Sequence, residues 1–538
     1  MIAPTSGFKN TVAIFALPPA SNYVLPLPAA CLSMTRRSVV LLPLLVRRSL
    51  GVGGLLLLFL ASCRKDEQFT GDPVQLVFSS DTVMFDTVFT QLTTSVTKRF
   101  TARNTSSNAV RVDIALEGGS PSPFRINVDG ASGLSFSDVE ILGGDRIYVF
   151  VEVTPGAGGV NTPFIVEDHI LFNTNGAEQS VLLTVWGQDA HFFRPGPDTV
   201  QVQGFPPFSY IAGGYDAFGN QVCEDITWVN DLPYVIFGYG VVDSCCSLTI
   251  EPGVRVYFHG GSGLWVYKGG RIAANGTVAE RITFQGDRLE PLYADLPGQW
   301  DRIWINEGPA DNVFTNVVIR NALIGIQCQT FPLTSGQPTS TNKLVLNNVN
   351  IQNCSAAGIL SENYRITSNN LLVANCGQYC VALTGGGEYF FNHSTIANYW
   401  VWDIRNSPAF IMTNQFADIN GEVQTRDIEN SIFRNGIIYG SNTNEFKLEI
   451  DAGANATYAF DHYLFRTDQS TSDLTHFPTD IYRNLNPGFE STTDFHLSAE
   501  NVTPVNKGVA STPDAFFDLD DVIRGDGQPD LGCYEYSE

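Results

Sequence analysis

The chain has 538 residues, of which 43% are hydrophobic and only 16% charged, with 49 glycines and 28 prolines. One hydrophobic core does not extend over this length, so two or more domains are expected, and the glycine and proline content favours short strands over long charged helices. The net charge of −24 argues against nucleic acid as a partner, because the field of the protein repels phosphate.

The N-terminal segment reads as an export signal and not as part of the fold. Residues 1–62 contain no acidic residue and five basic ones. Arg47 and Arg48 precede an apolar run, 50–60, that is too short to span a bilayer but has the length of a signal-peptide core. Met34 would begin a signal sequence of ordinary length and is the alternative start.

The apolar run ends in Leu60-Ala61-Ser62-Cys63, which resembles the lipobox of bacterial lipoproteins. The resemblance implies that Cys63 is lipidated, becomes the new N-terminus and begins a tether over 63–73. Lys65-Asp66-Glu67 is similar to a tag that directs some Gram-negative lipoproteins to the cell surface, so we expect a lipid anchor in the outer membrane and exposure at the surface. Without its signal segment the chain keeps 31 − 5 = 26 basic residues against 55 acidic ones, a net charge of −29.

Residues 74–190 are predicted to form a β-sandwich. Ile147, Val149, Val151 and Val153 alternate with more polar residues, and clusters of turn residues cut the segment into short strands. The segment resembles the immunoglobulin-like modules of bacterial surface proteins, which implies a spacer or adhesion unit; the matching stretches are Phe100–Asn104, Val112–Ile114 and Gly144–Val149. A proline-containing linker is expected at 191–209.

The rest of the chain carries an internal repeat that predicts a parallel β-helix over 210–538. The pattern of Asn, two residues, an apolar residue, one residue and Asn begins at Asn316, Asn348, Asn370, Asn430 and, with one residue inserted, Asn392. The steps from Asn348 to Asn370 and to Asn392 are 22 residues, and Asn414 continues them. A leucine-rich repeat has a similar period but needs a leucine lattice, whereas Val, Ile and Phe fill these sites.

The repeat also predicts what its residues do. Val317, Val349 and Leu371 occupy equivalent sites and should stack inward on coils about 4.8 Å apart. Asparagine tolerates left-handed backbone angles, and stacked amides bond from coil to coil, so Asn353 and Asn375 are expected to form a ladder.

The repeat region resembles the pectin-lyase-like superfamily of right-handed parallel β-helices. The resemblance covers roughly residues 210–538 and implies the fold, but this superfold hosts many activities. The stretches that carry it are Leu248–Phe258, Gly270–Thr277, Ile282–Phe284 and Gly298–Ile303 for the opening coils, and Asp494–Leu497, Pro504–Gly508 and Arg524–Glu535 for the closing segment.

Catalysis on such a helix needs a base, or paired carboxylates, facing outward on neighbouring coils. The sites two and four residues after the first Asn hold no acidic residue in the aligned repeats; they are Val318 and Arg320, Asn350 and Gln352, Leu372 and Ala374, Ile432 and Arg434. Alternation with Ile404 predicts that Asp403 and Arg405 face outward, as a catalytic pair or as a plain surface ion pair, while Trp402 points to the core.

Calcium is the only cofactor that the sequence suggests. Asp518, Asp520 and Asp526 crowd near the C-terminus, although their order departs from that of calcium loops and also fits a solvated acidic turn. No C-x-x-C pair occurs among the eight cysteines after Cys63, which argues against structural zinc. Cys354 and Cys376 should be neighbours on successive coils, within the Cα separation that a disulfide allows.

Two functions from different classes remain open at this point. The first is a non-catalytic cell-surface lipoprotein whose β-helix binds glycan or another surface partner. The second is an extracellular polysaccharide lyase or glycoside hydrolase. The sequence favours the first, because the predicted fold is clear while its usual catalytic groups are not evident.

Overall fold

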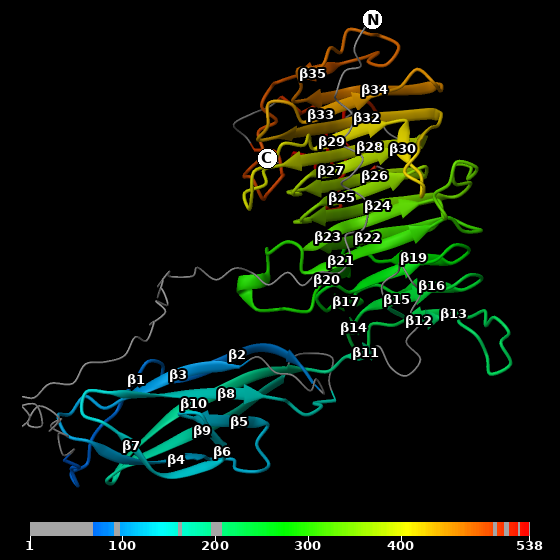
Figure 1. Ribbon diagram of the computed structural model, residues 1–538. Helices are drawn as coiled ribbons and strands as arrows, with labels where there is room; N and C mark the ends of the chain where they lie inside the picture. The colour runs from blue at the N-terminus through cyan, green and yellow to red at the C-terminus, as the bar shows by residue number, and fades with distance from the viewer. Residues whose placement is uncertain are drawn as a thin grey trace, which may run out of the picture.

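The computed structural model describes residues 68–90, 97–159, 164–194, 207–498, 503–510, 516–525 and 528–536. The signal segment, Cys63, most of the tether and Asp526 lie outside these ranges. The described part consists of strands and one 3-10 turn, η2 (Pro291–Tyr293), and none of its helices has the length and apolarity that crossing a membrane requires. A β-sandwich comes first and a tall parallel β-helix follows it (Figure 1).

The sandwich consists of two five-stranded sheets, ordered β1-β3-β8-β5-β6 and β2-β10-β9-β4-β7. Its strands are β1 (Val77–Phe78), β2 (Thr82–Phe89), β3 (Lys98–Arg103), β4 (Val110–Leu116), β5 (Phe124–Val128), β6 (Ala131–Gly133), β7 (Ser135–Ile141), β8 (Arg146–Val153), β9 (Phe164–Thr174) and β10 (Ala177–Gln188). The predicted alternation is confirmed, since Ile147, Val149, Val151 and Val153 all face the core between the sheets.

The sandwich joins the β-helix directly. β11 (His191–Phe193) lies inside the segment predicted as a linker, 191–209, yet it pairs with β14 (Tyr234–Ile236) and so belongs to the β-helix. Phe89 of the sandwich packs on Tyr257 of the β-helix with ring centroids 5.2 Å apart. The linker prediction is therefore corrected at its beginning, where backbone pairing and an apolar contact replace a free connection.

Each coil of the β-helix contributes to three faces, and every pairing between coils is parallel. Face 1 is the nine-stranded sheet of β12 (Phe208–Ala212), β15 (Tyr239–Val242), β18 (Gly263–Val266), β21 (Trp300–Asn306), β23 (Ala322–Gln329), β25 (Ala357–Glu362), β27 (Tyr379–Thr384), β29 (Phe410–Thr413) and β33 (Phe446–Glu449). A two-stranded hairpin, β30 (Gln415–Ala417) and β31 (Val423–Thr425), projects from one edge.

Faces 2 and 3 form one fourteen-stranded sheet that bends along its length. Face 2 consists of β13 (Asp225–Trp228), β16 (Ser247–Ile250), β19 (Arg271–Asn275) and the first halves of the long strands; face 3 consists of β11, β14, β17 (Arg255–Phe258), β20 (Ile282–Gly286), the second halves of the long strands and β35 (Ile481–Arg483). The long strands are β22 (Asn312–Arg320), β24 (Lys343–Gln352), β26 (Arg365–Ala374), β28 (Gly387–Asn398), β32 (Ile428–Gly440) and β34 (Ala456–Phe465).

The asparagine repeat makes the bend between faces 2 and 3. Asn316, Asn348 and Asn370 have φ angles of 51°, 54° and 49°, the left-handed region that asparagine tolerates. Asn348 Nδ2 donates to Asn316 Oδ1 at 3.2 Å, and Asn370 Nδ2 donates to Asn348 Oδ1 at 2.9 Å. The ladder therefore runs through the first Asn of each repeat.

The second Asn of the repeat does not form the predicted ladder. Asn353 and Asn375 also have positive φ, but Asn353 Nδ2 reaches Asp295 at 3.5 Å and Asn375 Nδ2 donates to the carbonyl of Thr492 at 3.0 Å. The two residues thus lie at the same corner of successive coils, as predicted, but their amides bond to segments outside the coil and not to each other.

Three positions of the repeat differ in the structure from what the sequence pattern predicts. The inserted residue in the fourth repeat places His393 at the bend, with φ 52°, opposite Asn370 and Asn435. Asn430 instead lies where the pairing of β32 is irregular, and Asn414 follows a strand of face 1. An insertion in a parallel strand changes which residue meets the bend, and a fixed spacing does not reveal that change.

The stacked apolar core is confirmed. Val317, Val349 and Leu371 pair in register, and their side chains are fully buried in one cluster that runs the length of the helix. Near the upper end the core becomes aromatic, with Phe433 and Phe460 stacked at 4.3 Å. Each such side chain contributes about 1.5–3 kcal/mol through its removal from water.

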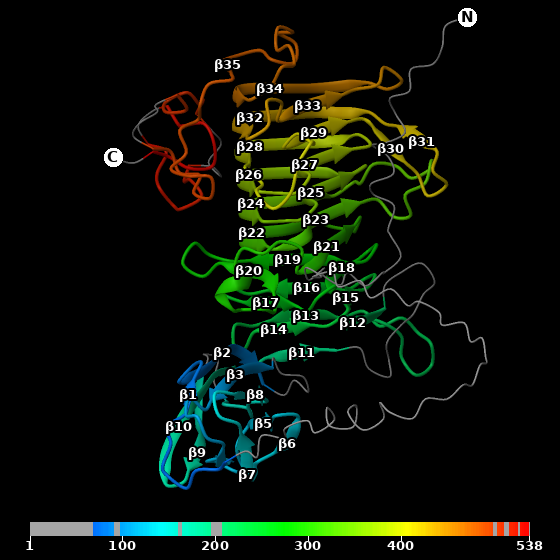
Figure 2. The same ribbon diagram turned by 60° about the vertical axis from the view of Figure 1, so that its left-hand side comes forward.

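The closing segment, residues 489–536, folds back over the upper part of face 3 (Figure 2). Its Phe495, Leu519 and Cys533 cover Leu372 and Ala374, which face outward from β26 and are nevertheless buried. Arg524 Nη1 and Glu535 Oε2 form a buried ion pair at 2.7 Å in this segment. The outward face of the upper coils is thus an internal interface of the protein.

Acid should weaken the fold through His393. Burial, with the charge of Arg524 second, holds the pKa of His393 well below its usual value. The unfolded histidine takes up its proton near pH 6.5, whereas the folded one stays neutral. The free energy of unfolding is therefore full above pH 6.5 and falls as the pH drops below it, by about 2 kcal/mol between pH 7 and pH 5. Urea unfolding at both pH values should show this loss in the wild type and a smaller loss in His393→Asn, which suits the bend. Equal losses in the two proteins would contradict the assignment.

Candidate functional site

Face 1 is the face that long connections border on both edges. Residues 287–299 and 399–409 lie at one edge, and residues 213–224, 330–342 and 414–427 lie at the other (Figure 1). Binding and catalytic residues concentrate where loops meet a rigid scaffold. The outward side chains of face 1 therefore form the candidate site.

Aromatic residues dominate the lower coils of face 1. Trp265 and Trp304 face outward on successive strands and stack at 4.6 Å with an interplanar angle of 10°, while Phe331 contacts both rings edge-on. Trp265 Nε1 donates to Asn306 Oδ1 at 2.8 Å. Because the two indole faces lie on each other, these rings support the face and do not present a free stacking surface.

Beside the tryptophans lies a network of polar side chains, which we name the Arg302 cluster. Its members are Tyr239, Asp301, Arg302, Gln327, Gln329 and Glu362. Asp301 accepts hydrogen bonds from the Tyr239 hydroxyl and from Arg302 Nε, the latter at 3.0 Å.

The network continues from Arg302 through two glutamines to a carboxyl group. Arg302 Nη1 donates to Gln327 Oε1. The Gln327 amide then donates to Gln329 Oε1 at 2.5 Å and to Glu362 Oε2 at 3.1 Å. From Asp301 to Glu362 the network spans three consecutive coils, and Tyr239 reaches it from two coils below β21. It fixes the rotamers of side chains that can bond to hydroxyl groups.

Burial shifts the titration of this cluster. It raises the pKa of Glu362, and the hydrogen bond from Gln327 and the charge of Arg302 oppose that rise only in part. Burial, with the neighbouring charge of Asp301, also raises the pKa of Tyr239 well above its usual value. Glu362 thus keeps its proton to higher pH than an exposed glutamate does, and in that form it donates as well as accepts hydrogen bonds.

The two carboxyl groups of the cluster come from different ends of their strands. Asp301 lies near the beginning of β21, whereas Glu362 aligns through Gln329 with Asn306, the last residue of that strand. Five residues of strand correspond to roughly 16 Å between Cα atoms. The side chains reach toward each other, and Arg302 and Gln327 connect the two carboxyl groups through hydrogen bonds.

A charged column on face 2 is a second candidate for the functional site. Arg365 bonds Glu388 and, at 2.7 Å, Glu429, which pair in register on the next two coils. The guanidinium lies against both carboxylates and so occupies the space that a sugar and its attacking water would need. This column therefore acts as an ion network between coils.

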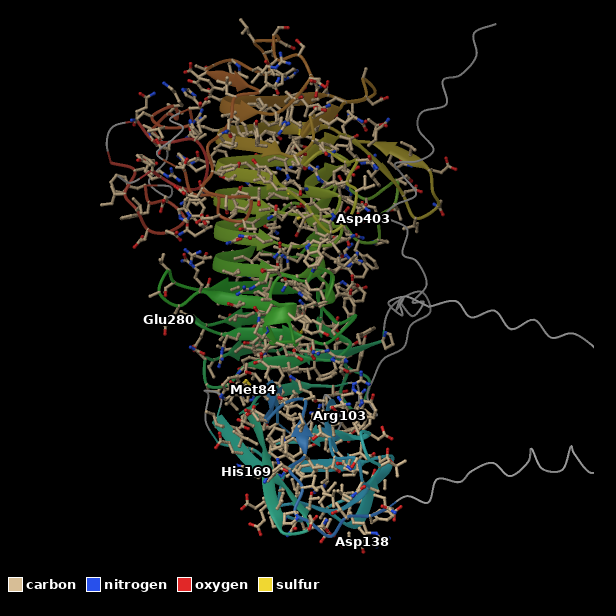
Figure 3. All side chains as sticks on the ribbon, turned by 90° about the vertical axis from the view of Figure 1, so that its left-hand side faces the viewer. Met84, Arg103, Asp138, His169, Glu280 and Asp403 are labelled. Atoms are coloured by element: carbon tan, nitrogen blue, oxygen red, sulfur yellow. A yellow bond between two sulfur atoms is a disulfide. The ribbon has the colours of Figure 1, made fainter. Side chains whose placement is uncertain are left out.

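The predicted outward pair Asp403 and Arg405 is corrected. β28 ends at Asn398, so residues 399–409 form a loop in which the alternation of a strand does not apply. Asp403 is exposed at the periphery (Figure 3), whereas the Arg405 side chain is 2% exposed and paired with buried Glu445. Trp402, predicted to face the core, is 52% exposed.

The aspartates suggested for calcium serve the closing segment. Asp518 is buried and accepts the backbone N–H groups of Asp520, Val522 and Glu535. Asp520 pairs with Arg281 at 2.9 Å and with His496 at 3.0 Å. Within the described residues no three potential ligands gather around one point, and Asp526 lies outside them.

The cysteine prediction is half right. Cys354 and Cys376 follow the paired residues Gln352 and Ala374 and so lie on successive coils, but both are buried thiols. Their sulfur atoms approach carbonyl oxygens of their own coils, at 3.7 and 3.6 Å, and the two thiols interact with each other without a covalent bond. A disulfide instead joins Cys223 and Cys245, 22 residues apart, with Cα atoms separated by 5.4 Å.

The Arg302 cluster was not predicted, although signals for it existed. Asp301 and Arg302 belong to the stretch Gly298–Ile303, which was noted only for its family resemblance. Gln327 and Gln329 alternate with Ile326 and Cys328, the pattern of a strand whose outer face is polar. Sequence spacing does not show that these strands are neighbours, because the connections between them differ in length.

Comparison with known proteins supports the β-helix. A family model described as "Right handed beta helix region" matches residues 236–401. Among solved structures, the catalytic unit of a GH87 alpha-1,3-glucanase from Streptomyces thermodiastaticus strain HF3-3 aligns over 72% of this chain and 89% of its own, with 10% identity and a TM-score of 0.18. No curated protein matches.

A second solved structure, the E. coli chaperone DraB, aligns over 23% of this chain with 12% identity and a TM-score of 0.17. The match spans 58% of the chaperone's length. At these TM-scores neither structure bears on function, and the family match together with the parallel pairing of the strands assigns a right-handed β-helix.

Proposed function

We propose that the protein is a non-catalytic lipoprotein of the outer membrane that binds glycan at the cell surface through the Arg302 cluster on face 1. In this proposal the N-terminal sandwich is an immunoglobulin-like spacer between the lipid on Cys63 and the β-helix. The observation that carries the proposal is the polar network itself, in which amide, guanidinium and carboxyl groups are held by one another on a flat sheet.

The chemistry of the cluster favours a hydroxyl-rich ligand. Gln327, Gln329 and the protonated form of Glu362 can each donate and accept hydrogen bonds, which matches sugar hydroxyls. Strands about 4.8 Å apart repeat such groups along the helix axis and so suit a polymer. The net charge of −24 repels polyanions over most of the surface, so at this face we expect a neutral glycan.

One observation favours the enzymatic alternative. A glutamic acid with a raised pKa, such as Glu362, is what a glycoside hydrolase uses as its general acid. If the protein cleaves glycans, Glu362→Gln should abolish turnover and leave binding in place. If wild-type protein binds without producing new reducing ends or unsaturated products, the non-catalytic proposal stands.

Glycan binding should depend on Gln327. Loss of its amide in Gln327→Ala leaves Arg302 and Glu362 without their shared partner and should weaken binding about tenfold, since one hydrogen bond to a charged group contributes about 1.5–3 kcal/mol. A glycan array identifies the ligand, and calorimetry then compares the variants.

The matched control is Arg103→Ala, an exposed position on the sandwich (Figure 3), which should bind like the wild type. Equal affinity of Gln327→Ala and the wild type, with both proteins folded by circular dichroism, would remove face 1 as the binding site.

Membrane attachment should depend on Cys63. Cys63→Ser removes the thiol that carries the lipid, so we expect an unprocessed precursor or release of the protein from the membrane fraction. Fractionation followed by mass spectrometry of the N-terminus measures both results. A variant that is still cleaved after Ser62 and still membrane-bound would refute the anchor.

A further inference from the structure

The lower part of face 3 is an outward surface that the closing segment leaves uncovered (Figure 2), although Phe89 of the sandwich covers Tyr257 at its lower end. Two columns of outward side chains cross it on four successive coils. One column holds Arg255, Thr283, Val318 and Asn350, and the other holds Tyr257, Gln285, Arg320 and Gln352. On the next coil these columns reach Leu372 and Ala374, where the closing segment begins to cover them.

Arg320 stands out on this surface because its charge has no counterpart among the described residues. Its guanidinium forms no ion pair or hydrogen bond with any of them, and its Nε is buried without a partner there. A buried N–H group without an acceptor is costly, so this group favours a ligand that supplies one.

Arg255 adds a second positive charge nearby. It hydrogen-bonds the Tyr257 hydroxyl, and both Arg255 and Arg320 act electrostatically on that hydroxyl. Tyr257 and Arg320 lie two coils apart, roughly 10 Å between Cα atoms, with Gln285 on the coil between them. The long side chains of Arg255, on the coil of Tyr257, and of Arg320 can reach a common ligand above Gln285.

Three carboxylates near this surface are already paired with other cations. Asp287 bonds His259 at 2.7 Å, Glu290 bonds Arg288 at 2.6 Å, and Asp520 bonds Arg281 at 2.9 Å. A fourth, Asp295, contacts the Asn353 amide at 3.5 Å. None of these carboxylates bonds Arg320, which therefore has no counterion among the described residues of a chain whose net charge is −24.

We propose that Arg320 and Arg255 form a binding site for an oxyanion, a carboxylate or sulfate group, with Gln285 and Gln352 donating hydrogen bonds beside them. The planar guanidinium matches two oxygens of such a group at once, which a lysine does not. This site lies on a different face from the Arg302 cluster and takes a different class of ligand, so it stands independently of the proposed function.

Calorimetry of the folded mature protein at low ionic strength tests the site with three probes, namely inorganic sulfate, glucuronate and an oligosaccharide rich in glucuronate. Arg320→Gln should weaken binding of each probe by tenfold or more, and added salt should weaken binding to the wild type. Arg320→Lys keeps the charge but loses the planar fork, so its affinity should be intermediate. The control Arg103→Gln should leave every affinity unchanged.

The probes also separate two sources of the oxyanion. Tenfold tighter binding of the oligosaccharide than of glucuronate assigns an acidic polymer, and equal binding assigns a small free anion. Gln327→Ala on face 1 should leave all three affinities unchanged, so a failure of the proposed function is distinguishable from a failure of this site. No measurable binding of any probe, or binding that Arg320→Gln does not alter, would overturn the proposal.

Discussion

Arg405→Ala should lower the free energy of unfolding by about 3–5 kcal/mol, as breaking a buried ion pair by removal of one partner does. Arg405 Nη1 bonds Glu445 Oε2 at 2.7 Å, Nη2 bonds the other carboxylate oxygen, and the two side chains are 2% and 0% exposed. The variant leaves a carboxylate buried without its counterion, and urea unfolding at pH 7 measures the loss.

The pH dependence of this variant's stability gives a second test of the buried pair. Burial already raises the pKa of Glu445, and the charge of Arg405 opposes that rise. Without Arg405 the carboxyl should protonate at higher pH, so the deficit in unfolding free energy should shrink as the pH falls through that raised value. Asp403→Ala is the matched control, because Asp403 is exposed and should change stability by no more than about 0.5 kcal/mol. Similar losses in the two variants would contradict the assignment of a buried pair.

Asn370→Ala should lower the free energy of unfolding by about 3–4 kcal/mol. The Asn370 amide donates to Asn348 at 2.9 Å and to the carbonyl of Phe517 at 2.6 Å, and its oxygen accepts from Arg524 at 3.2 Å. Three hydrogen bonds of this buried side chain contribute about 1 kcal/mol each, and alanine at a φ of 49° adds roughly another 1 kcal/mol of strain. Thermal and chemical unfolding measure the loss.

Two further variants separate these contributions. Asn370→Gly removes the same hydrogen bonds without the backbone strain, so it should be less destabilising than the alanine variant by about 1 kcal/mol. Asn347→Ala changes a half-buried amide on face 2 that has only a 3.5 Å contact with Asn369, and it should cost less than about 1 kcal/mol. Equal costs for Asn347→Ala and Asn370→Ala would show that the ladder contributes nothing beyond turn preference.

The fold was predictable because its signals are local and repeated. Val317, Val349 and Leu371 sit at equal places in successive coils, and each bend requires a residue that accepts left-handed backbone angles. The same rule failed at His393, where one inserted residue moved the bend, and at Asp403 and Arg405, where β28 had already ended. Alternation predicts a direction only while the strand continues.

The candidate site was less predictable because it depends on which coils are neighbours. Asp301 and Arg302 lie one coil from Gln327 and two from Glu362. The chain between these strands passes through faces 2 and 3 and differs in length, over residues 307–321 in one coil and 330–356 in the next. The unpaired charge of Arg320 is equally invisible in the sequence, since any of the chain's carboxylates was a potential partner.

The closing segment has a consequence for how the chain acquires its structure. Contacts between neighbouring coils are local, so a solenoid of this kind could form and melt coil by coil. The closing segment links coils that are distant in sequence, for Arg281 bonds Asp520 across 239 residues and Asn370 bonds Phe517 across 147. It can dock only after those coils exist, so it should fold last and make the opening and middle coils unfold as one cooperative unit.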